Sequence, residues 1–205
     1  QAPNWGAFYT SVFSSRKLRY DDEFTVPPGG VQVEVTFHEP NEGERLVMTD
    51  VKLSKVENPP TLNVNPDFAY GPRGFAGWNA GCNRRIEPDP DRAGGFRLVI
   101  GGNGFSGSAR SDWIPVRSGD TVRFAYRMRA SVDGRGGRVV VMRYRSTAQR
   151  DDCPDGEFAK RFYLGSRWTE GQHDFVVPPE TAILRLYAEN ATISYARFTR
   201  VAQGE

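Results

Sequence analysis

Histidine and cysteine are scarce in this chain of 205 residues. The two histidines, His38 and His173, lie far apart in the sequence, which argues against a Ser-His-Asp triad. The two cysteines, Cys82 and Cys153, exclude a cysteine-rich metal module. They leave two alternatives open, which are one disulfide or a pair of small unbonded residues. The side-chain chemistry therefore has to come from other residue types.

Long apolar runs and lysine are also missing. No stretch approaches the roughly 18 apolar residues of a membrane-spanning helix, so we expect no membrane partner. Of the 27 basic residues only 4 are lysine, and the net charge of +2 is too small for a general nucleic-acid-binding protein. The other 23 basic residues are arginine, whose planar guanidinium matches carboxylate and sulfate groups.

Turn-forming and aromatic residues, in contrast, are abundant. The chain has 22 glycines, 14 prolines and 12% aromatic residues, and no segment shows a helical period of 3.6 residues. Several segments alternate apolar and polar residues between turns, which is typical of β-strands. We predict an all-β fold whose strands after residue 61 are 96–100, 113–116, 121–129, 138–145, 161–164, 172–177, 183–189 and 193–199.

An internal repeat indicates two modules. The segments Phe24–Pro28 and Phe175–Pro179 are nearly identical, and each leads into an alternating strand. The two segments begin at residues 24 and 175, and a repeat unit as long as this separation is one domain. We predict that residues 1–56 are the C-terminal part of a first β-sandwich, 57–60 a linker and 61–205 a complete module. Three strands cannot bury both faces of a sandwich. The rest of the first module or a partner chain therefore completes residues 1–56. The alternative is that these residues fold back and extend the sheet of the second module.

Motifs after residue 61 have a recognisable order. They are Asn65-Pro66-Asp67-Phe68, Gly74-Phe75, Gly77-Trp78, Ser111-Asp112-Trp113, Val116 to Tyr126, Trp168-Thr169, Phe175 to Pro178 and Leu184 to Glu189. This order resembles jelly-roll carbohydrate-binding modules of the galactose-binding-like type, which accompany xylanases and glucanases. The resemblance covers nearly all of 60–202, whereas 13–53 match only the family's last third. It implies a jelly-roll β-sandwich, tandem copies with the first truncated, and a secreted, extracellular protein.

The resemblance also implies roles for single residues. Trp113 lies where the family places an aromatic ring that stacks on sugars, although it could equally fasten a strand end. Glu189 resembles a polar residue that accepts hydrogen bonds from sugar hydroxyls. Trp78 and Trp168 resemble core residues of the family.

Calcium is a structural ion in many of these relatives, held by an acid in the opening motif and an aspartate in the closing strand. The nearest positions here are Ala69 and Ala196-Arg197, which supply no oxygen ligand from their side chains. We expect no cofactor and no metal site, with a structural calcium as the alternative.

Strand parity predicts a cationic face. In strand 183–189, Leu184, Leu186 and Ala188 form the core side, so Arg185, Tyr187 and Glu189 face outward. The same alternation puts Arg127 and Arg129 on one side of strand 122–129, and Arg143 and Arg145 on one side of strand 139–145. If the three strands share a sheet, their outer face holds five arginines around Tyr187. The alternative is that the charges are neutralised by Glu189 and by acids of the loop 151–157.

These observations lead to three hypotheses. The first is a noncatalytic carbohydrate-binding module of a secreted polysaccharide-acting protein, with an anionic glycan as its ligand. Its predicted ligand-binding residues are Trp113, Tyr187, Glu189, Arg185, Arg143 and Arg127. The second is a structural or assembly module of an extracellular protein. The third is a catalytic domain, a polysaccharide lyase or glycoside hydrolase, for which we find no acid–base or nucleophile set and predict no catalytic residue.

Overall fold

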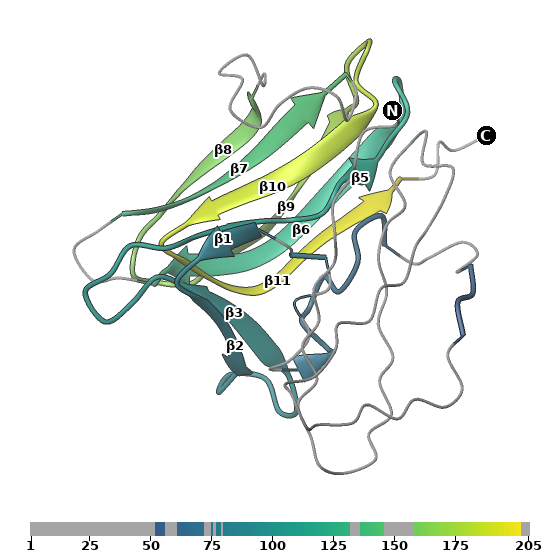
Figure 1. Ribbon diagram of the computed structural model, residues 1–205. Helices are drawn as coiled ribbons and strands as arrows, with labels where there is room; N and C mark the ends of the chain where they lie inside the picture. The colour runs from purple at the N-terminus through teal and green to yellow at the C-terminus, as the bar shows by residue number, and fades with distance from the viewer. Residues whose placement is uncertain are drawn as a thin grey trace, which may run out of the picture.

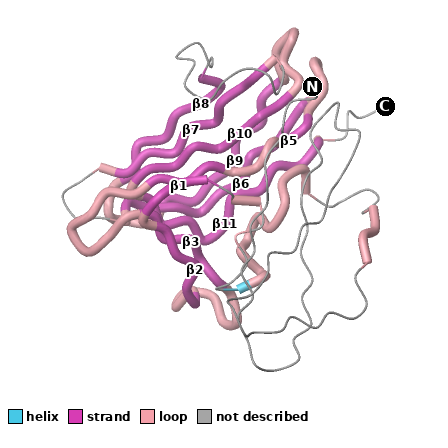
Figure 2. The backbone as a smooth tube through the Cα atoms, viewed as in Figure 1, coloured by secondary structure: helices cyan, strands magenta, loops and turns pink. Residues whose placement is uncertain are grey.

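The computed structural model describes residues 52–55, 61–71, 75, 77–78, 80–131, 136–145 and 158–201. These residues form eleven β-strands and, within the described ranges, no α-helix (Figure 2). The prediction of an all-β fold is confirmed. Apart from 52–55, the predicted first module and the linker lie outside the described residues. No helix long and apolar enough to cross a membrane occurs in the described part of the chain.

Two antiparallel sheets pack face to face as the layers of a sandwich (Figure 1). Sheet A has the order β1-β4-β10-β7-β8, with β5 paired to β10, and sheet B has the order β2-β3-β11-β6-β9. The strands of sheet A are β1 (Ala80–Cys82), β4 (Ser108–Arg110), β5 (Ile114–Pro115), β7 (Gly137–Tyr144), β8 (Phe158–Leu164) and β10 (Ile183–Glu189). Those of sheet B are β2 (Arg84–Pro88), β3 (Phe96–Ile100), β6 (Thr121–Ala130), β9 (Thr169–Val176) and β11 (Ala191–Arg200).

Several pairs of strands that follow one another in the chain lie in opposite sheets. This holds for β6 and β7, for β8 and β9, and for β10 and β11. Each connection therefore crosses from one layer to the other, which is the arrangement of a jelly-roll sandwich. The predicted jelly-roll fold is confirmed for the described module.

The core lies between the sheets and follows the predicted alternation. Val122, Phe124, Tyr126 and Met128 of β6 all belong to it. The ring of Phe124 stacks on that of Phe198 in the neighbouring β11, with centroids 4.6 Å apart. Burying rings and aliphatic chains of this size stabilises the sandwich by roughly 1.5–3 kcal/mol per side chain. The β6 and β11 pair is thus the centre of sheet B.

The segment before β1 closes one side of the core. Phe68 and Trp78 are fully buried, and their ring centroids lie 5.7 Å apart. Backbone hydrogen bonds from Leu62 to Phe198 at 2.7 Å and from Ala196 to Pro66 at 2.8 Å fasten this segment to β11. Trp78 is therefore a core residue, as predicted.

The predicted face of five arginines is wrong. β6 lies in sheet B while β7 and β10 lie in sheet A, so Arg127 and Arg129 are on the opposite side of the molecule from Arg185 and Tyr187. In β7, Arg143 pairs with the core residue Leu184 and lies on the inward side of sheet A. Strand parity separates two sides of one strand, but it does not tell which strands share a sheet.

Three strands escape the sequence prediction. β1, β2 and β4 are only three to five residues long and contain glycine or arginine. Such short segments carry too few alternating positions to stand out. Two of them, β1 and β4, extend sheet A beside β10 and so help to shape its outer face.

Candidate functional site

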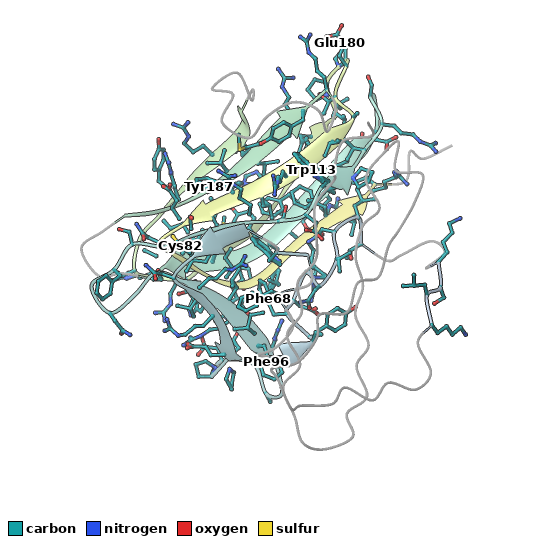
Figure 3. The ribbon with its side chains drawn as sticks, in the orientation of Figure 1. Phe68, Cys82, Phe96, Trp113, Glu180 and Tyr187 are labelled. Atoms are coloured by element: carbon teal, nitrogen blue, oxygen red, sulfur yellow. The ribbon has the colours of Figure 1, made fainter. Side chains whose placement is uncertain are left out.

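The outer face of sheet A presents two parallel rows of side chains. The register pairs Tyr187 with Arg110 on one side and Val140 on the other, and pairs Glu189 with Ser108 and Arg138. Paired residues project from the same side of a sheet. We call the Tyr187 face the set that consists of Arg110, Trp113, Arg138, Arg161, Tyr163, Tyr187 and Glu189. Figure 3 shows Tyr187, Trp113 and Cys82 along this sheet.

Tyr187 is the half-buried centre of the Tyr187 face. Its ring lies between two guanidinium groups, with Arg110 at 5.6 Å and Arg138 at 5.8 Å from the ring centroid. Its hydroxyl donates to one carboxylate oxygen of Glu189, and the Nε of Arg138 donates to the other at 2.5 Å. These contacts fix the orientation of the Tyr187 ring and of the Arg138 guanidinium beside it.

Two pKa shifts follow from this cluster. Burial raises the pKa of Tyr187, and its hydrogen bond to Glu189 raises it further. Burial alone would raise the pKa of Glu189, but hydrogen bonds from Arg138 and Tyr187 bring it below its ordinary value. At neutral pH the phenol is therefore neutral and the carboxylate is ionised, so the hydrogen-bonded arrangement persists.

Trp113 lies further along the same face, directly before β5. Its indole is half-buried, with the Arg185 guanidinium 4.4 Å from the ring centroid and the Tyr144 ring edge-on at 5.2 Å. Arg185 itself is only 5% exposed and donates from Nε to the Ser111 carbonyl at 2.7 Å. Arg185 thus supports the indole from within the protein.

The predicted ligand-binding residues divide into three groups. Trp113, Tyr187 and Glu189 lie together on the Tyr187 face, and for Tyr187 and Glu189 strand parity predicts this side. Arg185 lies on the same side of sheet A but is buried. Arg143 is on the inward side and Arg127 is on sheet B, so neither reaches this face.

Sequence reasoning missed four residues of this face. Arg138 comes directly before the hydrophobic run of β7. It is two residues from Val140, so strand alternation puts both on the same side of the sheet. Arg110 belongs to the short strand β4, which carries no recognisable alternation. Tyr163, at 76% exposure the most exposed aromatic residue among the described ones, pairs with Arg138, and Arg161 pairs with Val140.

The outer face of sheet B has a different charge pattern. Most of its arginines form ion pairs, such as Arg123 with Asp174 at 2.8 Å and Arg97 with Glu87 at 2.6 Å. On the Tyr187 face, the described residues supply three arginines and a single carboxylate. Glu189 pairs with Arg138, so this set has more arginines than carboxylates.

A tryptophan and two arginines stand out on sheet B. The side chain of Trp168 is half-buried, and its ring centroid lies 4.3 Å from the Arg127 guanidinium and 4.9 Å from that of Arg129. We call these three residues the Trp168 cluster. The prediction that Trp168 is a core residue is wrong, because it lies on the outer surface of the sheet.

Two oxygen-bearing side chains of the segment before β1, Asn63 and Asp67, contact β11. The Asn63 amide donates to the Ala196 carbonyl and accepts from the Phe198 backbone, both at 2.8 Å. Asp67 pairs with Arg197 at 3.4 Å. Both side chains therefore already have protein partners. The described residues contain no cluster of three or more His, Cys, Asp or Glu side chains that could hold a metal ion, and the absence of a structural calcium stays a prediction.

Cys82 is exposed and unbonded at the edge of sheet A. Its Sγ lies 3.8 Å from the hydroxyl of Ser108. The predicted partner, Cys153, is outside the described residues, so the disulfide stays a prediction.

Comparison with known proteins concerns the fold. No family model and no curated protein matches the sequence. The enzymatically active domain of tailspike protein 4 of bacteriophage CBA120 is similar with a TM-score of 0.50 and 9% identity, over 69% of this chain and 22% of that one. The match therefore spans less than a quarter of the chain of that domain.

Carbohydrate-binding modules are also among the similar structures. A family 16 carbohydrate-binding module has a TM-score of 0.46 and 18% identity, over 69% of this chain and 99% of that one. A xylan-binding domain of the CBM22 type from Paenibacillus barcinonensis has a TM-score of 0.44 and 12% identity, over 67% and 93%.

Proposed function

We propose that residues 61–205 are a noncatalytic carbohydrate-binding module that holds a polysaccharide against the Tyr187 face. The observation that carries the proposal is the setting of Tyr187, a ring flanked by Arg110 and Arg138 and fixed through Glu189. Aromatic rings pack against the C–H faces of sugars, and ionic groups beside them bind the sugar's polar substituents. The resemblance of the sequence motifs to carbohydrate-binding modules favours the same class of ligand.

The charges of the Tyr187 face favour an anionic glycan. Arg110, Arg138 and Arg161 gather there, while Glu189 is already hydrogen-bonded to Arg138 and Tyr187. A carboxylate or sulfate ester on the sugar would meet guanidinium groups in a bidentate geometry. We therefore propose a uronate or a sulfated polysaccharide as the ligand, and an extracellular location for the protein.

Trp113 would supply a second stacking surface on the same face. The packing of Arg185 and Tyr144 behind the indole holds its plane. A rigid ring loses little conformational entropy when a sugar binds to it. Two rings separated along one sheet suit an extended polysaccharide rather than a single sugar.

Affinity electrophoresis of the full chain tests this function. The gels contain neutral or anionic polysaccharides, at low and at high salt. We expect acidic polysaccharides to retard the protein, less so at high salt, and Tyr187→Ala and Trp113→Ala each to weaken binding about tenfold or more. Far-UV and near-UV circular dichroism check that the variants fold.

Three results would contradict the proposal. The absence of retardation by any polysaccharide would favour a structural or assembly module. Retardation that both alanine variants retain would place the site elsewhere. Release of reducing or unsaturated sugar ends from the polysaccharide would identify a hydrolase or a lyase.

A further inference from the structure

We propose that the Trp168 cluster is a second anion-binding site, which takes a carboxylate or sulfate group of an acidic polysaccharide on the opposite side of the sandwich. It shares no residue with the Tyr187 face, so it goes beyond the proposed function. Each site can be present without the other.

The first observation is that the Arg129 side chain lacks a carboxylate partner. Within the cluster, Arg127 has three carboxylate partners, Asp91 at 3.0 Å, Asp89 at 3.8 Å and Glu170 at 3.9 Å, which neutralise its charge. Arg129 has no carboxylate within ion-pair distance among the described residues, and its buried Nε has no hydrogen-bond partner there. Removing a cationic donor from water without giving it a partner is unfavourable. An anion bound at the Arg129 guanidinium would supply the missing counter-charge.

The position of Trp168 is the second observation. The Arg129 guanidinium lies against the indole, an interaction that offsets part of the desolvation of the cation. A guanidinium that stacks on a ring still has its N–H groups in the guanidinium plane, where a carboxylate or a sulfate can bind. Since Trp168 is only half-buried, its exposed surface can pack against the sugar that carries the anion.

The cluster is built on anchored backbone. Thr169, which follows Trp168, pairs with Met128 of β6, and the Ala130 amide donates to the Gly165 carbonyl at 2.8 Å. The segment 165–168 is therefore tied to the end of β6, the strand that carries Arg127 and Arg129. The cluster does not need to assemble when a ligand arrives.

Both sites lie toward one end of the sandwich. Arg129 pairs with Thr192 near the start of β11, and Glu189 ends β10, with a single residue between these two strands. An acidic polysaccharide could therefore contact both faces around this end, or two chains could be held by one molecule.

Fluorine NMR of the full chain tests the second site. The protein is labelled with 5-fluorotryptophan, so its 4 tryptophans give separate signals. Trp168→Phe and Trp113→Phe assign the two signals of interest. The probes are oligogalacturonate, a sulfated carrageenan oligosaccharide, a neutral cello-oligosaccharide and sodium sulfate.

We expect at least one acidic oligosaccharide to shift the Trp168 signal, while the neutral one leaves it in place. Arg129→Gln should raise the apparent Kd at Trp168 about tenfold or more. Arg123→Gln, on the same sheet face and paired with Asp174, is the matched control and should leave the shift unchanged.

The proposal is overturned if neither acidic oligosaccharide shifts Trp168, or if the shift persists in Arg129→Gln. It is also overturned if sodium sulfate matches the acidic oligosaccharides at equal anion concentration, because the site would then select a free ion. A shift at Trp168 without one at Trp113 supports the second site and counts against the function proposed for the Tyr187 face. A shift at Trp113 without one at Trp168 supports the function proposed for the Tyr187 face and overturns the second site.

Discussion

At the scale of single residues, the clearest feature is an arginine that is buried instead of exposed. Arg185 follows the alternation of β10 and points to the outer side of sheet A, yet it is among the buried charged residues. The indole of Trp113 and the carbonyl of Ser111 account for this position. Parity therefore identified the side of the sheet correctly, while the exposure of Arg185 depended on Trp113, which lies directly before β5.

We predict that Arg185→Met lowers the free energy of unfolding by about 1–3 kcal/mol, because the Ser111 carbonyl loses a charged donor and Trp113 loses its packing partner. Urea denaturation measures the loss, and the near-UV circular dichroism of the folded variant should change as Trp113 becomes mobile. Arg123→Met removes an exposed ion pair and should change stability little. Equal effects of the two substitutions would show that Arg185 is not a positioning residue.

At the scale of elements, the edge strand β1 depends on a glycine. Gly81 has φ +139° and pairs with Ala109 of β4. A Cβ at this position would lie 2.0 Å from the Ser108 carbonyl oxygen, a backbone atom that cannot move without disturbing the pairing. The close approach of β1 to β4 is thus possible only without a side chain.

We predict that Gly81→Ala destabilises the protein more than Gly119→Ala does. Gly119 has φ +84° and no atom within 4 Å of the added Cβ, so its substitution should cost only backbone strain, about 1–2 kcal/mol. Urea denaturation compares the variants, and hydrogen exchange should show faster amide exchange in β1 and β4 of Gly81→Ala. Equal stability losses would mean that the Ser108 carbonyl adjusts to the added methyl group.

Elements also show how far the sequence can be interpreted. Residues 96–100 and 183–189 were predicted with the bounds that the strands have, because their apolar runs end at clear turns. The pairing of β10 with β7 and not with β6 was not predictable, since it joins segments that local patterns do not relate. Parity predicted that Tyr187 and Glu189 lie on the outer side of β10, whereas placing Arg110 and Arg138 beside them required the register.

At the scale of the whole molecule, charge is unevenly distributed. The net charge is only +2, yet the Tyr187 face has three arginines and one carboxylate, while the outer face of sheet B has several arginines and several carboxylates that form ion pairs. Attraction of an acidic polysaccharide should therefore depend on which face a charge occupies. A general attraction would depend on the net charge alone.

A pair of substitutions with the same change in net charge separates these two cases. We predict that Arg110→Gln, beside Tyr187, weakens retardation by an acidic polysaccharide roughly tenfold and makes it less sensitive to salt. Arg123→Gln also removes one positive charge, but from the ion pair with Asp174 on the other sheet, and should have little effect. Affinity electrophoresis over a series of salt concentrations measures both. If the two variants lose affinity equally, the attraction follows net charge and the Tyr187 face has no special role. If only Arg110→Gln loses affinity, the Tyr187 face binds the glycan, and the arginines that flank the Tyr187 ring set the preference for an acidic glycan.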